Sequence, residues 1–282
     1  MQDAPSLARG VLLDGYPFLV LSARYPFPMR CCIVIPARMG STRFSGKPLC
    51  DLLGKPMVQW VAEAAQASGV AERVLVATPD REVVEACSRF GVEAVLTRAD
   101  HPSGTDRLAE VAERVSAEVY VNVQGDEPLI RPESIRACAQ PLLDDPNVPM
   151  GSVFSECPEE EYDDPAVVKV VTDHRGFALY FSRHPIPFPR NPRVEPVKKH
   201  VGIYAYRRET LQAFSTWPMS SLEAAESLEQ LRFLENGVRI LMSRGAGAEL
   251  AVDTPEQAEQ VRRLLAARGM AADAQREPDL TS

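Results

Sequence analysis

Short apolar runs alternate with stretches of helical periodicity through the first half of the chain. The apolar runs cover residues 31–35, 73–77, 92–97 and 119–123. Between the first two runs, apolar side chains recur on one face of a helix expected from Pro56 to Gly69, and a second helix ends near Gly91. Such alternation is typical of a parallel sheet with helices on both faces. The pattern predicts an α/β fold.

Near residue 148 the pattern becomes richer in strands. Strands at 167–171 and 177–181 are expected to form an antiparallel hairpin, and the five prolines between 182 and 196 exclude a helix there. The elements expected next are a strand at 201–206, a helix at 208–216, one helix from Ser221 to Asn236-Gly237, a strand at 238–242 and a last helix to about Arg268. We expect one domain, residues 30–268, with a smaller strand-rich subdomain at 150–206.

The two ends of the sequence do not continue this pattern. Residues 1–29 contain frequent prolines and glycines, and Met29 precedes the first clear strand. They are expected to be a leader, either a flexible extension or sequence upstream of the native start. Residues 269–282 are expected to be a disordered tail.

Composition narrows the class of protein. A net charge of −8 and a pI near 5.2, without a basic face, argue against a nucleic-acid partner. The six cysteines include no Cys-x-x-Cys pair, so reduced thiols are expected rather than a disulfide framework or a zinc site. No apolar run is long enough to span a membrane. A cytoplasmic location is therefore expected.

The loop after the first strand carries three cations. Arg38, Arg43 and Lys47 lie beside Gly40 and Gly46, where the absence of side chains lets backbone N–H groups approach a ligand. The loop differs from a P-loop because five residues separate its glycines and a proline follows the lysine. Its charge favours a polyanion such as a nucleoside triphosphate; a solvated basic loop is the alternative.

Two carboxylates follow apolar stretches. Asp126 follows the strand at 119–123, and Asp253 follows a second apolar stretch before Pro255. Open α/β sheets bind ligands at the carboxyl ends of their strands, so both side chains can reach one sheet edge. Oxygen ligands of this kind, with phosphate and water, suit Mg²⁺. Asp253 taken alone could also be a plain carboxylate at a helix start.

Several motifs can be compared together. They are Ile35-Pro36-Ala37-Arg38, Ser41-Thr42-Arg43, Gly46-Lys47-Pro48-Leu49, Thr97-Arg98-Ala99-Asp100-His101, Ser103-Gly104-Thr105, Asn122-Val123-Gln124-Gly125-Asp126-Glu127-Pro128, His200-Val201-Gly202-Ile203-Tyr204, Leu228-Glu229-Gln230-Leu231-Arg232 and Val252-Asp253-Thr254-Pro255-Glu256. In this order they resemble the 3-deoxy-manno-octulosonate (Kdo) cytidylyltransferase family. The resemblance runs from about residue 30 to residue 268. It implies a mostly parallel, Rossmann-like three-layer sandwich of the nucleotidyltransferase (GT-A-like) type, with the strand-rich subdomain as lid and dimer contact.

The resemblance also implies a reaction. CTP and Kdo would give CMP-Kdo and pyrophosphate, in a Mg²⁺-dependent attack of the anomeric hydroxyl on the α-phosphate, for lipopolysaccharide synthesis. Such a transfer needs positioning and charge neutralisation, and the sequence offers cations and carboxylates without a nucleophile–base triad. No membrane or nucleic-acid partner is implied, and a homodimer is expected.

By similarity, the implied site residues form four groups. Arg38, Arg43 and Lys47 would hold the triphosphate, with Asp126 also catalytic; Asp126 and Asp253 would hold the metal; Arg98, His101, Ser103, Gly104 and Thr105 would read cytosine; Gln124, Arg183, His200, Tyr204, Glu229 and Gln230 would bind the acid sugar. A packed structural histidine is the alternative for His200, and a solvated helix face is the alternative for Glu229 and Gln230.

One feature departs from the family pattern. Phe44-Ser45 stands where the family usually has Leu-Pro, which is expected to loosen the loop slightly without removing a cation. The alternatives for function are the same transfer to a related acid sugar, such as 8-amino-Kdo or a sialic acid, and a non-catalytic nucleotide or sugar sensor on the same fold.

Overall fold

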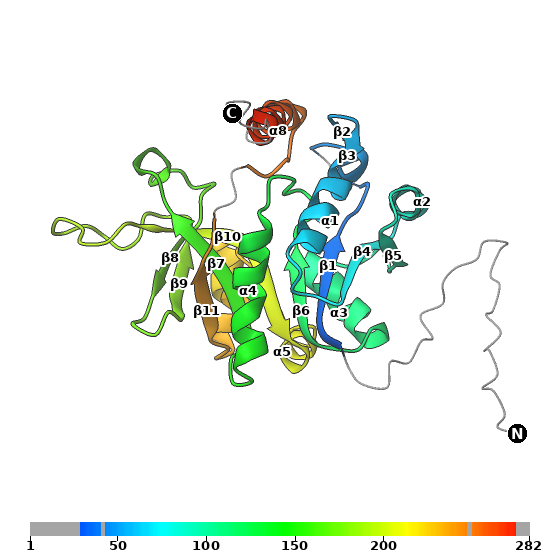
Figure 1. Ribbon diagram of the computed structural model, residues 1–282. Coiled ribbons are helices and arrows are strands. Elements are labelled where there is room, and N and C mark those ends of the chain that lie inside the picture. The colour runs from blue at the N-terminus through cyan, green and yellow to red at the C-terminus, as the bar shows by residue number, and fades with distance from the viewer. Residues whose placement is uncertain (1–28, 41–42, 247–249, 275–282) are drawn as a thin grey trace, which may run out of the picture.

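The computed structural model describes residues 29–40, 43–246 and 250–274. Residues 1–28 of the expected leader and 275–282 of the expected tail lie outside this part of the chain. Within it, a central sheet has helices on both faces, which confirms the three-layer α/β fold (Figure 1). None of the helices in this part combines the length and apolar character that crossing a membrane requires.

Seven strands form the main path of the sheet. Their spatial order is β11 (Ile240–Arg244), β7 (Met150–Glu156), β10 (Lys198–Arg207), β6 (Ala117–Val123), β1 (Met29–Pro36), β4 (Arg73–Thr78) and β5 (Glu93–Leu96). Strands β6, β1, β4 and β5 are parallel, and β10 runs antiparallel between β6 and β7. The carboxyl ends of the four parallel strands therefore meet at one edge.

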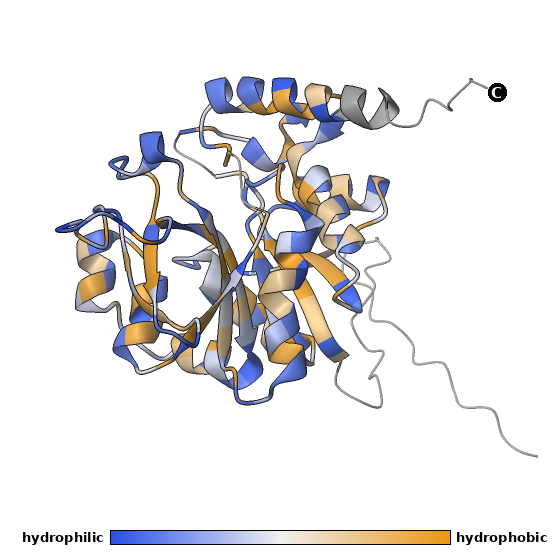
Figure 2. Cartoon of the chain, turned by 60° about the vertical axis from the view of Figure 1, so that its left-hand side comes forward, coloured by the Kyte–Doolittle hydropathy of each residue, from blue (hydrophilic) through white to orange (hydrophobic). Residues whose placement is uncertain are grey.

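Helices cover the sheet according to the alternation of β1. Cys31, Ile33 and Ile35 point toward the face with α1 (Met57–Ala67), α2 (Arg81–Arg89) and α4 (Pro132–Asp144). Cys32 and Val34 point toward α3 (Gly104–Arg114) and α5 (Arg208–Phe214). Because both faces are covered, the strand is apolar at every position from 31 to 35, and the strands carry the most hydrophobic segments in Figure 2.

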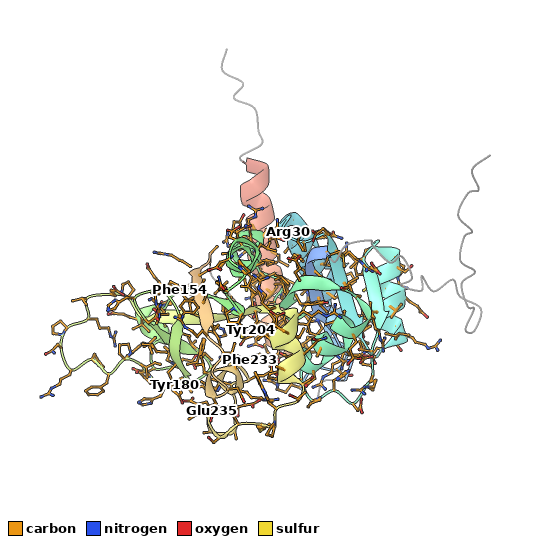
Figure 3. The ribbon with its side chains drawn as sticks, turned by 90° about the horizontal axis from the view of Figure 1, so that it is seen from below. Arg30, Phe154, Tyr180, Tyr204, Phe233 and Glu235 are labelled. Atoms are coloured by element: carbon orange, nitrogen blue, oxygen red, sulfur yellow. The ribbon has the colours of Figure 1, made fainter. Side chains whose placement is uncertain are left out.

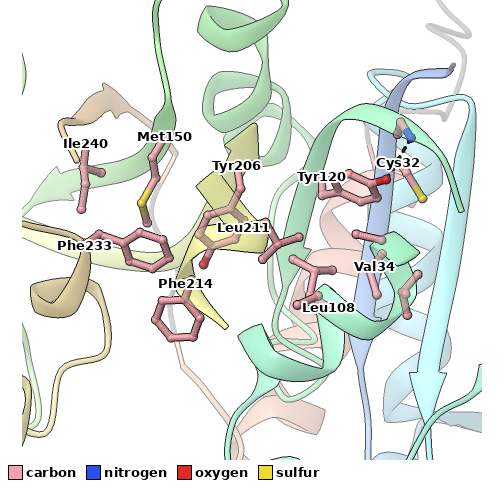
Figure 4. Packing of buried hydrophobic residues seen from close by; sticks show 14 of the residues in the cluster. Cys32, Val34, Leu108, Tyr120, Met150, Tyr206, Leu211, Phe214, Phe233 and Ile240 are labelled. Atoms are coloured by element: carbon pink, nitrogen blue, oxygen red, sulfur yellow. Dashed lines mark hydrogen bonds between the residues drawn. The ribbon is translucent and has the colours of Figure 1, made fainter. Parts of the chain in front are cut away.

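An aromatic group continues the second face beneath β10. The ring centroids of Tyr206 and Phe233 are 5.4 Å apart, and Phe233 stacks on Phe214 with 4.7 Å between ring centroids. Figure 4 shows these rings beside Met150 and Ile240, with Leu211 joining them to the Leu108 and Val34 side of the core. The core is thus continuous across the whole sheet.

The strand-rich region is divided between the sheet and a projection. Of the strands at 150–206, β7 and β10 belong to the central sheet, whereas β8 (Lys169–Thr172) and β9 (Ala178–Ser182) form the expected antiparallel hairpin. This hairpin joins the sheet through two residue pairs with β10 and projects to one side (Figure 1). The 3-10 helix η2 (Glu159–Glu161) lies in the same region.

Three expectations for the helices require correction. The helix expected from Ser221 to Asn236 is two helices, α6 (Ser221–Glu226) and α7 (Gln230–Glu235), because Ser227 takes a left-handed conformation at φ 52°. Its N-cap is Ser220, which forms a capping box with Glu223. The last helix, α8 (Pro255–Ala274), continues through residues 269–274, so the prediction that the disordered tail begins at residue 269 is wrong.

Two small elements and one helix lie outside the sequence expectations. The strands β2 (Asp51–Leu52) and β3 (Lys55–Pro56) form a hairpin after the 3-10 helix η1 (Lys47–Leu49), and α4 precedes β7. Helix α8 packs over this hairpin through Val261 and Leu265, which share a separate apolar cluster with Leu52 and Met57. This packing brings the C-terminal part of the chain to the carboxyl edge of the sheet.

Candidate functional site

Segments that follow the three strands β1, β5 and β6, together with Asp253, line a pocket of about 520 Å³ at the carboxyl edge of the sheet. Backbone hydrogen bonds hold neighbouring strand ends side by side, from Ala37 N to Ala77 O (2.9 Å) and from Thr97 N to Thr78 O (2.9 Å). Gly125 passes so close to β1 that a Cβ there would lie 2.7 Å from the Pro36 carbonyl oxygen. A glycine is therefore required where the ends of β6 and β1 meet.

The basic loop is folded back on itself at one wall of the pocket. Gly46 takes a left-handed conformation (φ 74°) and donates from its N–H to the Met39 carbonyl (3.0 Å). Met39 N in turn donates to a carboxylate oxygen of Asp80 at 2.7 Å. This anchoring sets the direction of Lys47, which opens η1 immediately after Gly46.

Lys47 joins the two expected metal carboxylates. Its Nζ lies 2.7 Å from Asp126 Oδ2 and 3.1 Å from Asp253 Oδ1, and Arg43 also contacts Asp253 at 3.1 Å. Asp253 reaches this position because Val252 N donates to the Asp126 carbonyl oxygen at 2.8 Å. The start of the last helix supports it, since the Gln257 carboxamide oxygen accepts hydrogen bonds from Asp253 N and Thr254 N.

This carboxylate pair fits a magnesium ion. The ammonium of Lys47 already lies between Asp126 and Asp253, so the two side chains are arranged around a single cation position. The described residues contain no group of three or more His, Cys, Asp or Glu side chains placed to share a metal. The protein would thus supply two carboxylates, which suits Mg²⁺ because this ion retains water and phosphate oxygens as its other ligands.

Arg38 and Arg107 line the same pocket in a different way. Among the described residues, neither guanidinium has a carboxylate oxygen within 4.0 Å, in contrast to Arg43 and Lys47. Burial lowers the pKa of Arg107, and the neighbouring positive charge of Arg38 lowers it further. The pocket lining therefore holds two cations that contact carboxylates, Arg43 and Lys47, and two that contact none among the described residues, Arg38 and Arg107.

The expected cytosine-reading residues are only partly gathered here. His101, Ser103 and Gly104 line the pocket, and so does Gln124, which is expected to bind the acid sugar. Arg98 instead lines a separate cavity of about 280 Å³ and pairs with Asp100. Thr105 donates its hydroxyl to Glu229, which joins α3 to the segment before α7.

His101 is held by a buried carboxylate. Its Nε2 forms a short contact with Glu110, which also accepts a hydrogen bond from Arg98 N at 2.9 Å. Burial opposes ionisation of Glu110, yet hydrogen bonds from His101 and Arg98 N and the charge of Arg114 lower its pKa overall. The imidazole is thus fixed in orientation at the pocket wall.

Four of the residues expected to bind the sugar lie together between β10 and α7, outside the lining of the pocket. We call these residues the β10–α7 cluster: His200, Tyr204, Glu229 and Gln230. Tyr204 donates to Gln230 Oε1 at 3.1 Å and packs on His200 with 5.4 Å between ring centroids. In Figure 3 Tyr204 lies near Phe233 in the middle of the molecule. The buried Nε2 of Gln230 has no hydrogen-bond partner among the described residues.

His200 in this cluster is neutral, and its tautomer follows from its contacts. The Ser152 hydroxyl donates to the Ile203 carbonyl (2.8 Å), so its contact with His200 Nε2 (2.9 Å) must be a hydrogen bond that the imidazole donates. Nδ1 therefore carries the lone pair. Burial lowers the pKa of His200 to about 3. His200 can therefore accept a hydrogen bond at Nδ1, and it carries no charge near neutral pH.

Glu127 lies at the junction of the pocket and the β10–α7 cluster. Gly202 leaves room for it, because a Cβ at Gly202 would lie 3.1 Å from Glu127 Oε1, and the buried Oε2 has no partner among the described residues. Burial first, and then the charge of Asp126, raise the pKa of Glu127 to about 8. A carboxyl group with a raised pKa thus follows directly after Asp126, one of the two carboxylates expected to hold the metal.

Arg183 lies in a different environment from the other expected sugar residues. Its guanidinium donates to the carbonyl oxygens of Glu226 (2.8 Å), Pro165 (3.0 Å) and Ser227 (3.4 Å). These contacts connect the end of β9 to the turn between α6 and α7, and Arg183 is absent from the pocket lining. In this structure it joins segments of the chain.

Sequence reasoning missed Arg107, Asp80 and Glu127. Arg107 follows Ser103 by four positions, which is about one turn of α3, so this spacing was the signal that could have placed it on the same face as the expected cytosine turn. Glu127 belongs to the motif Asn122-Val123-Gln124-Gly125-Asp126-Glu127-Pro128, but no role was predicted for it. Asp80 offered no local signal, because its contact with Met39 spans 41 positions.

Comparison with known proteins agrees with this geometry. The family model described as Cytidylyltransferase matches residues 32–240. A 3-deoxy-manno-octulosonate cytidylyltransferase of Escherichia coli is 51% identical over 238 residues, covering 84% of this chain and 96% of that protein. One of the same name from Pseudomonas syringae pv. tomato is 50% identical over 254 residues, covering 83% and 98%.

Solved structures give the same result. The structure of a CMP:2-keto-3-deoxy-manno-octonic acid synthetase complexed with CTP superposes with a TM-score of 0.82 at 48% identity, covering 85% of this chain and 99% of that one. A 4-diphosphocytidyl-2C-methyl-D-erythritol synthase from Anaerococcus prevotii, at 10% identity and a TM-score of 0.58, shares the fold alone. The chain belongs to the 3-deoxy-manno-octulosonate cytidylyltransferase family.

Proposed function

We propose that this protein transfers CMP from CTP to the anomeric hydroxyl of Kdo and releases pyrophosphate. The observation that carries the proposal is the pocket in which Arg38, Arg43 and Lys47 meet Asp126 and Asp253, in a chain of this family. The CMP-Kdo formed would supply lipopolysaccharide synthesis. Relatives with this name, and a related synthetase with CTP bound, support the nucleotide and the sugar.

The pocket residues have distinct tasks in this reaction. The hydroxyl oxygen bonds to the α-phosphorus and releases its proton to water. The bond from that phosphorus to the bridging oxygen breaks, and pyrophosphate leaves with the electron pair. Arg38, Arg43 and Lys47 would bind the triphosphate and stabilise the charge that grows on pyrophosphate. Bound Mg²⁺, held by Asp126 and Asp253, would supply Lewis acidity at the α-phosphate.

The β10–α7 cluster would position the acid sugar. His200 presents a neutral acceptor at Nδ1, and Gln230 has a buried amide donor without a partner among the described residues. Sugar hydroxyls need donors and acceptors of this kind more than formal charge. We propose in addition a cytoplasmic location. We also propose a homodimer, supported by the exposed apolar side chains of Leu179 on β9 and of Phe188 and Val194 in the segment between β9 and β10.

Measurement of CTP-dependent pyrophosphate release tests this proposal. Kdo should give the highest kcat/KM, with 8-amino-Kdo and a sialic acid as competing substrates and no release when the metal is chelated. A lack of turnover with Kdo, alongside turnover with another acid sugar, would refute the substrate. CTP binding without release from any sugar would instead support the sensor alternative.

A further inference from the structure

Arg107 is a buried cation that the pocket does not neutralise. The residue is 3% exposed and lies on α3, one turn from the Ser103 end of that helix. Its guanidinium lines the pocket with Arg38 and has no carboxylate oxygen within 4.0 Å among the described residues. Glu110, Asp80 and Asp100 favour its charge from a distance, but burial and the charge of Arg38 oppose it more strongly. An anion in the pocket would therefore supply a counter-charge that no described side chain supplies at contact distance.

The hydrogen bonds that Arg107 makes to the described residues use only one of its nitrogens. NH1 donates to the hydroxyl of Thr97 and to the carbonyl oxygen of Arg98, the latter at 2.8 Å. These bonds fix the guanidinium at the end of β5 while NH2 and Nε make no hydrogen bond to the described residues. Two parallel N–H groups of a fixed guanidinium match two oxygens of a phosphate.

The other cations of the pocket are less available to an anion. Lys47 and Arg43 both contact Asp253, and Lys47 also contacts Asp126. If an anion binds before the metal does, Lys47 and Arg43 are still paired with carboxylates when the anion arrives. Arg38 and Arg107 are the two cations of this lining whose charge is unopposed at contact distance among the described residues.

We propose that Arg107 is a further nucleotide-binding residue, whose guanidinium binds the phosphates of the incoming nucleotide beside Arg38. The proposal rests on the proposed function for the identity of the nucleotide. The charge and geometry of Arg107 apply to any polyphosphate.

A purely structural role for Arg107 makes a different prediction, and Arg114 provides the matched control. Arg114 lies on the same helix and also joins it to the end of β5, since its NH1 donates to the Leu96 carbonyl at 2.7 Å. It contacts Glu110 and lines the separate cavity rather than the pocket. Loss of Arg114 removes a similar helix-to-strand connection without removing a cation from the pocket.

The experiment measures the affinities of CTP, tripolyphosphate and cytidine by calorimetry in EDTA. In Arg107→Gln, the Kd of CTP and of tripolyphosphate should rise about 10- to 100-fold, while that of cytidine changes less than about twofold. Arg107→Lys should give an intermediate loss of CTP affinity, because lysine keeps the charge but lacks the two parallel N–H donors of the guanidinium. Arg114→Gln should lower the Tm and leave the ratio of CTP to cytidine affinity unchanged.

Other outcomes separate this inference from the proposed function. Equal losses for CTP and cytidine in Arg107→Gln, or no loss for either, would overturn the role of Arg107 even if the wild type produces CMP-Kdo. A wild type that ignores CTP but binds tripolyphosphate through Arg107 would refute the function and support the inference. If Arg107→Gln does not fold, unchanged phosphate affinity in Arg107→Lys overturns the proposed contact of the two N–H donors with phosphate.

Discussion

The pocket and the β10–α7 cluster are both polar, but they differ in charge. The pocket brings together Arg38, Arg43, Lys47, Asp126 and Asp253, which are charged groups arranged around a partly exposed space. In the cluster, burial lowers the pKa of His200 and raises the pKa of Glu229 and Tyr204, so each favours its neutral form. One region is suited to a polyanion and a metal, and the other to hydroxyl groups.

The difference follows from depth in the fold. The pocket lies beyond the ends of the strands, where water and ligand oxygens can solvate charge. The cluster lies beside β10 against the aromatic side chains beneath the sheet, where an unpaired charge would be costly. Both regions meet at Glu127, next to Asp126 in sequence and next to Gly202 in space.

The strongest way to break this comparison is to remove a pocket carboxylate. Asp126→Asn should lower kcat about 10²- to 10³-fold, because the metal loses a ligand and Lys47 loses a partner. Steady-state pyrophosphate release at saturating Mg²⁺ measures this effect. Glu156→Gln, which removes an exposed carboxylate paired with Arg244, is the control. Near-normal kcat in Asp126→Asn would contradict the metal assignment.

A second test separates the two kinds of cation in the pocket. Without metal, Arg38→Gln should weaken CTP binding about 10- to 100-fold, because no described carboxylate competes for Arg38. Arg43→Gln should change it less than about threefold, since this side chain is 66% exposed and already contacts Asp253. Calorimetric titration in EDTA measures both affinities. Equal losses of CTP affinity in the two variants would mean that the contact with Asp253 does not weaken the binding of CTP by Arg43.

A pH experiment tests the neutrality of the β10–α7 cluster. The folded pKa of His200, about 3, lies below the unfolded value near 6.5. Between these values the unfolded chain binds a proton that the folded chain does not, so the free energy of unfolding decreases as the pH falls. From pH 7 to pH 5 this group should account for a loss of about 1–2 kcal/mol.

Urea unfolding of wild type and His200→Gln at both pH values measures this contribution. Glutamine cannot take up the proton, so the variant should lose less stability between pH 7 and pH 5 than the wild type does. His174→Gln, at an exposed turn, is the matched control. An identical pH dependence in wild type and His200→Gln would show that His200 is not held neutral.

The smallest expected effect concerns the order of the basic loop rather than its charge. Ser45→Pro restores the residue usual in the family and should raise the free energy of unfolding by about 0.4–1 kcal/mol, because a proline restricts the unfolded chain. The kcat should stay within about twofold, since every cation remains. Thermal unfolding and pyrophosphate release measure the two quantities. A much larger fall in kcat would show that Ser45 has a role of its own.

Much of the fold was predictable because its signals are local. The alternation of apolar runs and helical stretches predicted β1, β4, β6 and the helices α1 and α2, and both faces of β1 are indeed buried. The single helix expected after Ser221 was wrong, since its apolar positions continue across a break that one left-handed residue, Ser227, introduces. Periodicity does not detect a conformation of that kind.

The candidate site was predictable to a different extent. Arg38, Arg43 and Lys47 are close in sequence, so a single basic loop predicted all three. Asp126 was predicted to lie near them because ligands bind at the carboxyl ends of the strands in open α/β sheets. Arg98 and Arg183 were expected in the site from resemblance. The structure places Arg98 at a separate cavity and Arg183 on backbone carbonyl oxygens, so a binding role for either remains a prediction.

The sequence by itself determined the parallel α/β core, the basic loop at its edge and the family, because each depends on residues near one another in the chain or on motifs in a fixed order. Only the tertiary structure decided which cations are neutralised. Lys47 and Asp253 are 206 positions apart, and they meet because Val252 docks on Asp126 and α8 packs over the β2–β3 hairpin. Pairing of charges depends on distances in space, and these follow from packing that no local pattern encodes.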